Sequence, residues 1–397
     1  MQIGIVGKPS SGKSTFFNAV TMSDVPMAAY PFTTIEANKA IAFVRIDCVD
    51  KEFDVQCNPR TGFCENGTRF VPVEVIDVAG LVPGAHTGKG RGNQFLSDLS
   101  RADVLIHVVD ASGSTNSEGE NVGLGNHDPC EDVHFLEEEI EEWFYGIIQK
   151  NWKTFYKKPI EGKTQLIEVI SQNLSGIGAN NNDIDNVLTK IGLLEKKLES
   201  WSDEEKKSFA VELRRESKPI IIAANKADLK GADENIEKMK KEFPHLMIIP
   251  CSAISELTLK KAAKDGKISY LSGANEFGAK EVSDEQKKGL EYIQENVLGK
   301  FGSTGCQETL EKSVFELLNY LAIYPGGANK LCDQNGNYLP DCFLMAPGST
   351  VLDFAYKLHT DFGKHFIRAI DVKTKKLVGK EHELKHRDVI EIIHSAK

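Results

Sequence analysis

The segment QIGIVGKPSSGKST at residues 2–15 decides the fold of this chain. Its first part, QIGIV, is short, apolar and rich in β-branched side chains, which is typical of a strand buried in a parallel sheet. The part that follows, GKPSSGKST, fits the phosphate-binding loop pattern of two glycines separated by four residues, then a lysine and a hydroxyl. The segment FFNAV at residues 16–20 continues as a helix. The order of strand, loop and helix therefore favours a phosphate-binding loop over a simple glycine-rich turn.

Each fixed position of this loop has a chemical reason. Gly7 and Gly12 allow the backbone to direct its N–H groups at the β- and γ-phosphates of a nucleotide, and Lys13 adds a positive charge at the same oxygens. Ser14 offers a hydroxyl to Mg²⁺, and the helix that begins at Thr15 directs its positive end at the anion. The predicted phosphate-binding residues are Gly7, Ser11, Gly12, Lys13, Ser14 and Thr15.

Length and composition set the broad class. The 397 residues are enough for two to three domains, and 41% hydrophobic with 27% charged residues is ordinary for a soluble globular protein. Because 48 basic residues face 58 acidic ones, the formal charge is −10, so any RNA contact needs a local basic patch. The sequence has no signal-peptide pattern and no apolar run near ~18 residues, so we expect a cytoplasmic protein that does not enter a membrane.

Further strands alternate with helices along the chain. Buried strands are expected over residues 37–46, 70–80, 104–110, 219–224 and 246–250. A helix is expected over residues 93–100, and the glycine-dense stretch at residues 80–92 predicts a mobile loop. This alternation predicts an α/β domain with a mostly parallel sheet and right-handed crossovers.

Two other stretches have helical patterns instead. Apolar residues recur at helical spacing over residues 135–148 and, with heptad-like steps, over residues 184–201. Ser202 and Glu205 form a capping-box pattern that opens a third helix. We interpret this stretch as a helical insertion whose apolar stripes form a core rather than a cofactor site. Residues 256–322 also read as helical, ending in a strongly apolar helix over residues 310–321 before the sequence YPGG.

Three of the eight cysteines lie in a polar, turn-rich segment at residues 47–66. Cys48, Cys57 and Cys64 are nine and seven residues apart, and none of them forms a CxxC pair, so the spacing fits a zinc site poorly. In a reducing compartment we favour structural thiols, or a disulfide in an organism that lives at high temperature, over a metal site. The free, bridged and metal-bound states all stay open at this point.

Two positions after the phosphate loop suit the γ-phosphate and its metal ion. Thr34 is placed to close a loop over the γ-phosphate and to coordinate Mg²⁺. Asp77 ends a strand, where it can hold Mg²⁺ through water, and Gly80 can offer its N–H to the γ-phosphate. We therefore assign Lys13, Thr34 and Gly80 to hydrolysis, and Ser14, Thr34 and Asp77 to the magnesium site.

The sequence NKAD at residues 225–228 follows another buried strand. A carboxylate at Asp228 can accept both N1–H and N2–H of guanine, whereas adenine presents no such pair of donors. Lys226 can lay its aliphatic stem along the base, and Asn225 belongs to the same motif. After the next strand, Ser252 and Ala253 can direct a backbone N–H at guanine O6. A solvated loop is the alternative for the tetrapeptide alone, but its position after the other motifs favours base recognition.

Taken in order, these motifs resemble those of the translation-factor-like GTPases, and in detail those of the Obg family, especially its YchF-related and developmentally regulated GTP-binding branches. The marks are YPFTT at residues 30–34, DVAGL at residues 77–81, the glycine-rich GAHTGKGRG at residues 84–92, and the helical insertion. The resemblance covers roughly the first 110 residues and residues 219–253. It implies a Ras-like P-loop fold that binds and hydrolyses GTP with Mg²⁺. The intact NKAD separates the chain from YchF-like members whose altered base-reading motif accompanies ATP use.

The last seventy residues carry a resemblance of their own. The stretches GSTVLDFAYKLHTDF at residues 348–362, FIRAID at residues 366–371 and DVIEI at residues 388–392 resemble a TGS domain, a ubiquitin-like β-grasp module. That resemblance implies contact with RNA or ribosomal components. From residue 328 onward eleven Lys and Arg face nine Asp and Glu, with five histidines, a slight basic bias that permits RNA contact. A protein-binding β-grasp module stays open as the alternative.

Two positions depart from related GTPases. Many GTPases have a glutamine after the glycine of Asp-x-x-Gly to orient the attacking water, but this chain has Leu81, so hydrolysis should be slow or assisted by another group. His86 is nearby, but a lone histidine in such a loop is more often solvated, and we do not assign it. Ser10 stands where several relatives have an asparagine that helps to bind a monovalent cation, which leaves potassium stimulation open.

We predict a GTPase domain over residues 1–325 and a TGS domain over residues 326–397. The GTPase core comprises residues 1–128 and 217–265 with a packing helix near residues 308–322, and the helical insertions are residues 129–216 and 266–307. The leading hypothesis is a slow GTPase switch that acts on ribosomes or RNA–protein assemblies. The alternative is a nucleotide-gated protein-binding adaptor without direct RNA contact. A small-molecule kinase is disfavoured because NKAD and paired switch loops have no use there. The partner and oligomeric state are not specified by the sequence.

Overall fold

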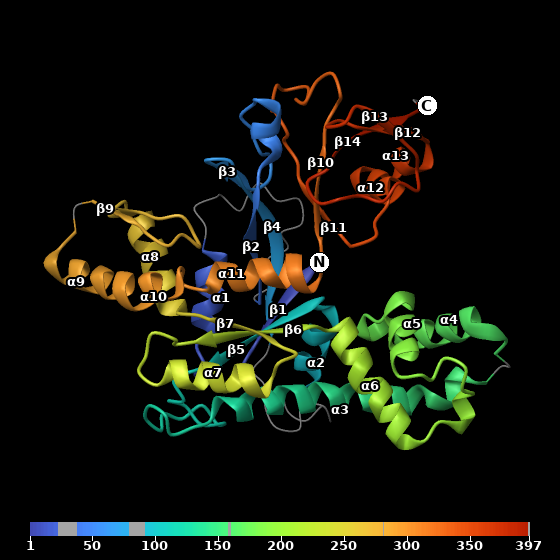
Figure 1. Cartoon of the computed structure of the whole chain (residues 1–397), viewed down its shortest axis with the longest axis horizontal. Coiled ribbons are helices and arrows are strands. Elements are labelled where there is room, and N and C mark those ends of the chain that lie inside the picture. Colours follow the sequence, from blue (N-terminus) through green and yellow to red (C-terminus); the bar gives the residue numbers. More distant parts are fainter. Residues whose placement is uncertain (23–37, 79–91, 158–159, 281, 396–397) are drawn as a thin grey trace. The chain divides into compact units, whose positions relative to one another are not determined.

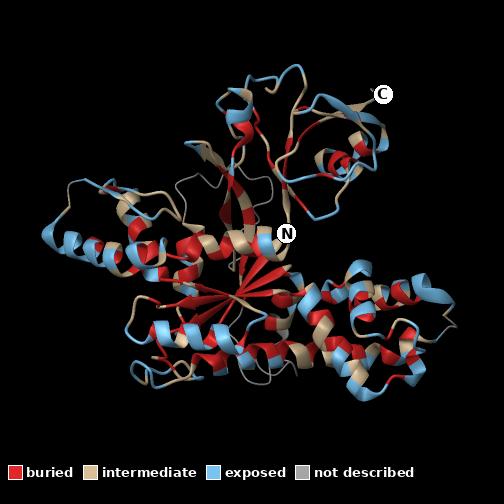
Figure 2. Ribbon diagram, viewed as in Figure 1, coloured by how far each residue is buried: buried red, intermediate tan, exposed pale blue. Residues whose placement is uncertain are grey.

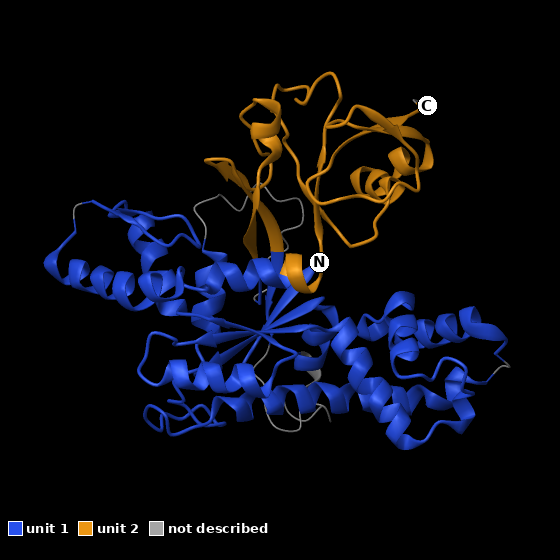
Figure 3. Cartoon of the chain, viewed as in Figure 1, with its two compact units in different colours: residues 1–22, 38–40, 74–313 blue, residues 23–37, 41–73, 314–397 orange. Residues whose placement is uncertain are grey.

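The computed structural model describes residues 1–22, 38–78, 92–157, 160–280 and 282–395 (Figure 1). The chain divides into two compact units (Figure 3). The first unit contains Met1–Met22, Asn38–Ala40 and Glu74–Ser313, and the second contains Ser23–Ala37, Ile41–Val73 and Val314–Lys397. Among the described residues, no helix combines the length and the apolar character needed to cross a membrane.

A seven-stranded sheet organises the nucleotide-binding part of the chain. Its strand order is β2-β4-β1-β5-β6-β7, and β3 pairs with β4. β1 pairs in parallel with β4 and β5, β5 with β6, and β6 with β7, whereas β3 is antiparallel to β4. The mostly parallel α/β sheet is therefore confirmed. The strands are β1 Gln2–Val6, β2 Lys39–Asp47, β3 Phe63–Glu65, β4 Thr68–Asp77, β5 Val104–Asp110, β6 Ile220–Asn225 and β7 Met247–Pro250.

Helices cover both faces of the sheet in the first unit, as Figure 1 shows. α1 Lys13–Thr21 packs against α8 Ala253–Lys264 and α11 Cys306–Lys312, while α3 Pro129–Phe155 packs against α7 Ala232–Glu242 and β5. α2 Gly92–Arg101 contacts β1, which confirms the helix expected after the glycine-rich stretch. Because helices lie on both faces, all residues of β5 and β6 are buried (Figure 2).

The helical insertion is confirmed, with one helix shorter than its pattern indicated. Besides α3 it contains α4 Gly162–Leu174, α5 Asn181–Lys190 and α6 Asp203–Ser217, and Ser202 caps α6 through the expected reciprocal bonds with Glu205. The continuous stripe expected up to Trp201 is wrong, because α5 ends at Lys190 and Gly192 adopts a φ of 71°. Beyond this break Leu198, in a short 3₁₀ turn, and Trp201 are buried outside any α-helix, so their spacing reflected burial rather than a continuous helix.

The region after β7 also corrects the sequence interpretation. A short hairpin of β8 Ile268–Ser269 and β9 Gly278–Ala279 precedes α9 Asp284–Ile293, which Ser283 and Gln286 cap as expected. The helix expected over residues 310–321 is wrong at its end. α11 continues through a π turn at Ser313–Leu317, and β10 Leu321–Pro325 is a strand. A short apolar run does not distinguish a buried helix from a buried strand, and Asn319, with a φ of 52°, separates the two elements.

The C-terminal residues form a five-stranded sheet with order β11-β10-β14-β12-β13. β10 is parallel to β14, and the other neighbours are antiparallel. The other elements are β11 Phe343–Met345, α12 Val351–Leu358, α13 Thr360–Lys364, β12 Phe366–Asp371, β13 Lys376–Val378 and β14 Val389–His394. Phe354 of α12 is fully buried in a core with Ile323 and Ile390, so a helix packs across the mixed sheet as in a β-grasp fold.

Residues 41–73 pack with this C-terminal sheet in the second unit. The segment between β2 and β3 contains a 3₁₀ helix, Val49–Phe53, and the sequence interpretation missed β3 because residues 47–66 are polar and turn-rich. The fully buried Arg69 donates to the carbonyl oxygens of Leu339 and Pro340, each at 3.0 Å. The Arg60 Nε also donates to Asp341 at 3.2 Å. The two bonds of the buried Arg69 are expected to stabilise the second unit, because an unpaired guanidinium is costly to bury.

Candidate nucleotide-binding site

The phosphate loop requires glycine at both of its fixed glycine positions. A Cβ on Gly7 would lie 2.7 Å from the carbonyl oxygen of Val108 and 2.8 Å from the Ser11 hydroxyl oxygen. A Cβ on Gly12 would lie 2.2 Å from Asn225 Nδ2, and Gly12 has a φ of 91°. Any side chain at these positions would therefore displace backbone or the side chain of Asn225. The tight curvature that leaves N–H groups free for phosphate depends on these two residues.

Two predicted site residues meet at the mouth of the loop. The ammonium group of Lys13 forms an ion pair with the carboxylate of Asp77, and it also donates to the carbonyl oxygen of Val78 at 3.1 Å. The two side chains are 15% and 29% exposed, so both are accessible to a ligand. Lys13 at the start of α1, predicted to bind phosphate, and Asp77 at the end of β4, predicted to hold the metal ion, are therefore side by side.

Asn225 connects the phosphate loop, 214 residues earlier in the sequence, with the segment at Ala253, 28 residues later. Its Nδ2 donates to the carbonyl oxygen of Ser11 at 2.9 Å, and its Oδ1 accepts from the N–H of Ala253 at 3.0 Å. Asn225 is itself buried at the end of β6. Asn225 therefore connects the phosphate loop with the segment predicted to bind the base, and a direct contact of Asn225 with a nucleotide stays a prediction.

An ion pair between Lys226 and Asp110 connects the NKAD motif with the end of β5. The sequence analysis assigned a role to Lys226 but not to Asp110. Lys226 Nζ lies 2.8 Å from Asp110 Oδ2 and 3.3 Å from the Ser114 hydroxyl. Burial alone would raise the pKa of Asp110, but hydrogen bonds from Lys226, Ser112 and Ser114, among others, lower it below its usual value. Asp110 lies at the carboxyl end of β5, where functional residues of open α/β sheets gather, and this position was the available signal.

Asp228 has an unsatisfied acceptor. Its Oδ1 is buried and has no hydrogen-bond partner within the described residues. The carbonyl oxygen of Asp228 accepts from the hydroxyl of Tyr292 at 3.1 Å. Burial and, to a lesser extent, the Asp228 charge raise the pKa of the Tyr292 phenol. A buried carboxylate oxygen without a donor is unfavourable unless a ligand supplies one. The residue thus fits a base that presents adjacent N–H groups.

The backbone N–H groups predicted to face guanine O6 already have protein acceptors. The N–H of Ser252 donates to the carbonyl oxygen of Thr304 at 2.9 Å, and that of Ala253 donates to Asn225. The Ser252 hydroxyl donates to Ser255 at 2.8 Å. The segment is therefore fixed beside Asn225, and an O6 contact from either residue stays a prediction.

Lys8, the second residue of the phosphate loop, was not singled out from the sequence. Its side chain is 5% exposed, and its Nζ lies 2.6 Å from the carbonyl oxygen of Thr115 and 2.8 Å from Asp132 Oδ2. Asp132 is in the first turn of α3, and its other oxygen lies 3.0 Å from His127 Nε2. Burial raises the pKa of Asp132 despite these two neighbours. The phosphate loop is thereby joined directly to the first helix of the insertion.

The remaining predicted residues divide into two groups. Ser14 and Thr15 are in the first turn of α1, with Ser14 exposed, as a metal and phosphate site requires. Thr34, Gly80, Leu81 and His86 lie at residues 23–37 and 79–91, outside the described residues, so their roles stay predictions.

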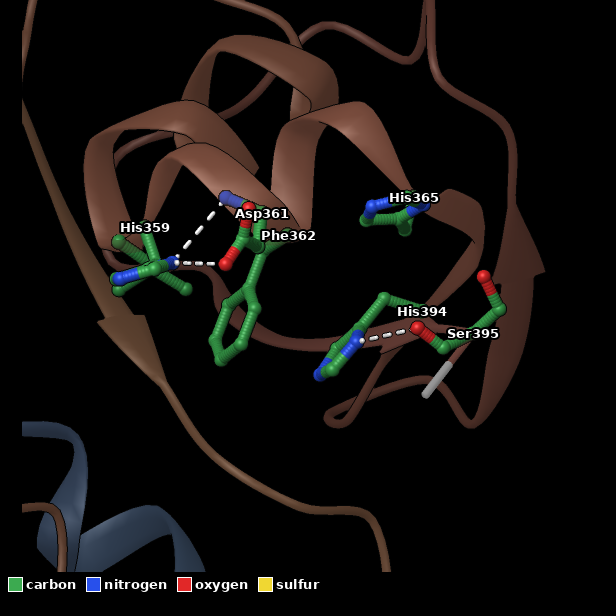
Figure 4. Close-up of a pocket in the computed structure, with 7 residues that line it drawn as sticks. His359, Asp361, Phe362, His365, His394 and Ser395 are labelled. Carbon is green, nitrogen blue, oxygen red and sulfur yellow. Dashed lines mark hydrogen bonds and ion pairs between the residues drawn. The ribbon is translucent and has the colours of Figure 1, made fainter. Parts of the chain in front are cut away.

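A separate pocket lies in the C-terminal sheet unit (Figure 4). It has a volume of about 390 Å³ and is lined by Leu358, His359, Asp361, Phe362, His365, His394 and Ser395. The rings of Phe362 and His394 are stacked with centroids 4.3 Å apart and planes 20° from parallel. The sequence analysis counted the histidines of this region without placing three of them together. An aromatic pair at an open pocket suits a planar ligand.

The chain thus combines a phosphate loop, a carboxylate at the end of β4 beside the loop lysine, and a carboxylate with an unpaired buried oxygen just after β6, which defines the class of P-loop nucleotide-binding proteins. Three family models match successive parts of it. They are 50S ribosome-binding GTPase over residues 2–143, Obg-like GTPase YGR210-like, G4 motif-containing domain over residues 223–326, and TGS domain over residues 336–394.

Comparison with individual proteins covers the whole chain. An uncharacterized GTP-binding protein of Methanocaldococcus jannaschii is 47% identical over 397 residues, 100% of this chain and 99% of the relative. Obg-like ATPase 1 of Homo sapiens is 26% identical over 403 residues, 97% of this chain and 86% of the relative. The chain belongs to the Obg-like, YchF-related family of P-loop GTPases with a C-terminal TGS domain.

Two solved structures agree with this assignment. The crystal structure of a GTP binding protein from Pyrococcus horikoshii is 40% identical and superposes with a TM-score of 0.78 over 100% of both chains. The YchF GTPase of Schizosaccharomyces pombe is 21% identical, with a TM-score of 0.59 over 99% of this chain and 97% of that one, which shows the shared fold.

Proposed function

We propose that this protein binds GTP with Mg²⁺ and hydrolyses it slowly to GDP and phosphate. The observation that carries the proposal is the buried Oδ1 of Asp228, which has no hydrogen-bond partner among the described residues. Asn225, in the same NKAD motif, hydrogen-bonds to Ser11 of the phosphate loop. Guanine presents N1–H and N2–H side by side and so satisfies a carboxylate at both oxygens. Adenine has no such pair and would leave the buried oxygen unsatisfied, at about 1–3 kcal/mol.

The ion pair between Lys13 and Asp77 suggests how the site accepts its ligand. When the nucleotide enters, Lys13 exchanges the Asp77 carboxylate for phosphate oxygens, and Asp77 becomes free to hold Mg²⁺ through water. Ser14 and Thr34 would supply hydroxyl ligands to the metal ion. A bound Mg²⁺ would neutralise charge on the phosphates, and Lys13 with the loop N–H groups would orient them.

Hydrolysis is slow because the chain supplies no side chain at Leu81 that could orient the attacking water. Thr34 and the N–H of Gly80 contact the γ-phosphate in this proposal. Loss of the γ-phosphate then releases both segments, which precede β2 and follow β4 along the chain. The nucleotide state is in this way converted into a change of loop conformation, and the protein acts as a switch.

We place the partner of the switch in the cytoplasm, as a ribosome or another RNA–protein assembly. Support comes from the TGS domain, from the match to a 50S ribosome-binding GTPase model, and from the stacked rings of Phe362 and His394 in the pocket of Figure 4. Unpaired RNA bases are commonly bound by stacking on aromatic side chains. A nucleotide-gated protein adaptor is the second candidate, favoured by the net charge of −10.

Base recognition is tested by the substitution Asp228→Asn. We expect the preference for GTP over ATP to fall by about a hundredfold, the equivalent of one to two charge-assisted hydrogen bonds. Competition of GTP and ATP against a labelled GDP measures it. Asp233→Asn is the matched control, because Asp233 is an exposed carboxylate on α7 that pairs with Lys300. Unchanged selectivity in Asp228→Asn would overturn the base-reading proposal.

Partner recognition is tested by co-sedimentation with ribosomes, with the protein loaded with GDP or a non-hydrolysable GTP analogue at two salt concentrations. We expect sedimentation with the analogue only, weakened by salt because phosphate contacts release counterions. No sedimentation in either nucleotide state would overturn the ribosome assignment and favour the protein adaptor, while leaving GTP binding intact.

A further inference from the structure

Three thiols and one carboxylate come together in the second unit. One ligand atom from each of Cys48, Asp50, Cys57 and Cys64 lies within 4.8 Å of all the others. The Sγ atoms of Cys48 and Cys57 are 3.5 Å apart, and Cys64 Sγ is 3.8 Å from Asp50 Oδ2. Three of the four residues are buried and Cys64 is partly buried. We call this group the cysteine cluster.

We propose that the cysteine cluster binds a single zinc ion through the three thiolates and the Asp50 carboxylate. Ligands about 2.3 Å from a tetrahedral zinc ion lie roughly 3.8 Å from one another, which agrees with the separations in the cluster. Thiolates select zinc over magnesium and calcium, which prefer oxygen ligands. Four ligands close the coordination shell, as in structural rather than catalytic zinc sites.

A disulfide accounts for the cluster less well. It would join only two of the thiols and leave the third beside a buried carboxylate. Asp50 is 2% exposed, and its only described hydrogen-bond donors are the N–H groups of Lys51 at 2.8 Å and Cys57 at 3.4 Å, and the thiol of Cys64. A buried carboxylate with so few donors is stabilised by a cation, and a zinc ion supplies that charge where a disulfide does not.

The backbone brings the ligands together from four separate places. Cys48 follows β2 directly, Asp50 is in the 3₁₀ helix, Cys57 is in the loop after it, and Cys64 is in β3. The N–H of Cys48 donates to the carbonyl oxygen of Gly67 at 2.8 Å, which fixes the start of the segment against the β3–β4 turn. The positive charge of the buried Arg69 also acts on Cys48 and Cys57 and offsets the negative charge of the ligands.

The ion would fasten an otherwise irregular segment. Residues 47–66 contain one 3₁₀ helix and one three-residue strand, so few backbone hydrogen bonds hold them. The same segment carries Arg60 and Glu52, which bind Asp341 before β11 and Lys373 after β12. Zinc therefore stabilises the second unit, and it does so independently of the nucleotide.

The test uses the full chain, purified with reductant and without chelator. We expect elemental analysis to find about one zinc ion per chain. We expect Cys57→Ser and Cys64→Ser to lose most of it, while Cys332→Ser, a partly buried cysteine of the same unit outside the cluster, retains it. GTP affinity in each variant reports that the first unit is folded. Equal zinc content in all four proteins, or none in the unaltered chain, overturns the proposal.

A second measurement decides the matter if a cysteine variant fails to fold. Cobalt(II) is titrated into the unaltered, metal-depleted chain, and we expect thiolate-to-cobalt charge-transfer absorption together with the intense visible bands of tetrahedral cobalt, both displaced by zinc. Asp50→Asn should keep the thiolate absorption and bind more than about tenfold more weakly. Octahedral cobalt without thiolate absorption overturns the site, and so does a Cys48–Cys57 disulfide found by mass spectrometry in the reduced preparation.

Discussion

The nucleotide site and the cysteine cluster are built in opposite ways. The nucleotide site takes short contiguous motifs from the carboxyl ends of β1, β4, β6 and β7, where a parallel sheet brings them together regardless of their separation in sequence. The cysteine cluster takes single residues from the segment between β2 and β4, which contains only a 3₁₀ helix and the short strand β3. A binding motif can be recognised from the sequence when consecutive residues and their own backbone contact the ligand. A cluster of isolated side chains is recognisable only when the surrounding chain has been placed.

The side chains of the two sites also differ in solvent exposure. This difference suits one site to exchanging a nucleotide and the other to stabilising the fold. Lys13 and Asp77 are 15% and 29% exposed, whereas Cys48 and Cys57 are 3% and 4% exposed. A nucleotide has to enter and leave, so its partners remain accessible. A structural ion has no such requirement, and its ligands are enclosed. The comparison implies that each site can be removed without loss of the other.

The largest expected effect comes from Lys13→Ala. We expect GTP affinity to fall more than about a hundredfold, because the ammonium group makes charge-assisted bonds to the phosphates. The zinc content should stay unchanged. Calorimetric titration with GTP and elemental analysis of the same sample measure both, with Lys241→Ala on α7 as the surface control. A parallel loss of zinc would show that the two sites are not independent.

Asn225→Ala is expected to weaken nucleotide binding indirectly, by releasing the phosphate loop from the segment at Ala253. It deletes two buried hydrogen bonds, to Ser11 and from Ala253, and leaves both backbone groups unpaired at about 1–3 kcal/mol each. We expect GTP affinity to fall by roughly ten- to a hundredfold and the midpoint of thermal unfolding to fall with it. Asn235→Ala, which removes one bond to Ala111, should lower stability without changing GTP affinity. Equal effects on affinity would refute the bridging role of Asn225.

A smaller effect is expected in the pocket of the C-terminal unit. Phe362→Ala removes the ring stacked on His394, and base–aromatic stacking contributes about 1–3 kcal/mol per base. We expect binding to single-stranded RNA or to ribosomes to weaken about tenfold, with GTP affinity and zinc content unchanged. Leu377→Ala, an exposed apolar residue on β13, serves as the control in the same filter-binding assay. Unaltered RNA binding would favour the protein adaptor.

We expect the free energy of unfolding of the first unit to fall gradually with decreasing pH because of the buried His107. Burial lowers the pKa of His107 to about 3, below its usual 6.5. Between these two pH values the imidazole is protonated in the unfolded chain but neutral in the folded chain. Stability is therefore present above pH 6.5 and is lost as the pH falls toward 3, by up to about 1.4 kcal/mol per pH unit from this residue. Denaturant titrations between pH 7 and 5 should show a shallower slope in His107→Gln.

Exposed His382, replaced in the same way, provides the control for that slope. Using the Cys57→Ser chain as the background removes any contribution from zinc release, since thiolate ligands are also protonated by acid. An identical slope in His107→Gln and the unaltered chain would contradict a neutral buried His107.

Local sequence determined most of the nucleotide site. The roles predicted for Gly7, Gly12, Lys13 and Asp77 follow from chemistry within a few residues, and the alternation of strands and helices predicted the parallel sheet on which they meet. Helix starts were predicted equally well, because Ser202 with Glu205 and Ser283 with Gln286 form bonds confined to one turn. The TGS domain was recognised from segments that lie close in sequence.

Helix ends were less predictable, because they depend on tertiary burial. Trp201 and Leu321 fitted helical apolar patterns, yet one lies beyond a break at Gly192 and the other begins a strand. Burial selects an apolar residue in either conformation, so the pattern alone could not decide between them.

The sequence by itself determined the fold class and the phosphate loop, and it predicted a carboxylate suited to guanine, because each is encoded in contiguous residues whose backbone geometry is local. Only the tertiary structure decided that Asn225 bridges Ser11 and Ala253, that Lys8 reaches Asp132 on α3, and that Cys48, Cys57 and Cys64 converge on Asp50. Their spacing along the chain argued against a metal site. The distance between the thiols depends on how β3 pairs with β4 and on the hydrogen bond from Cys48 to Gly67. The number of residues between two cysteines does not predict either of these contacts.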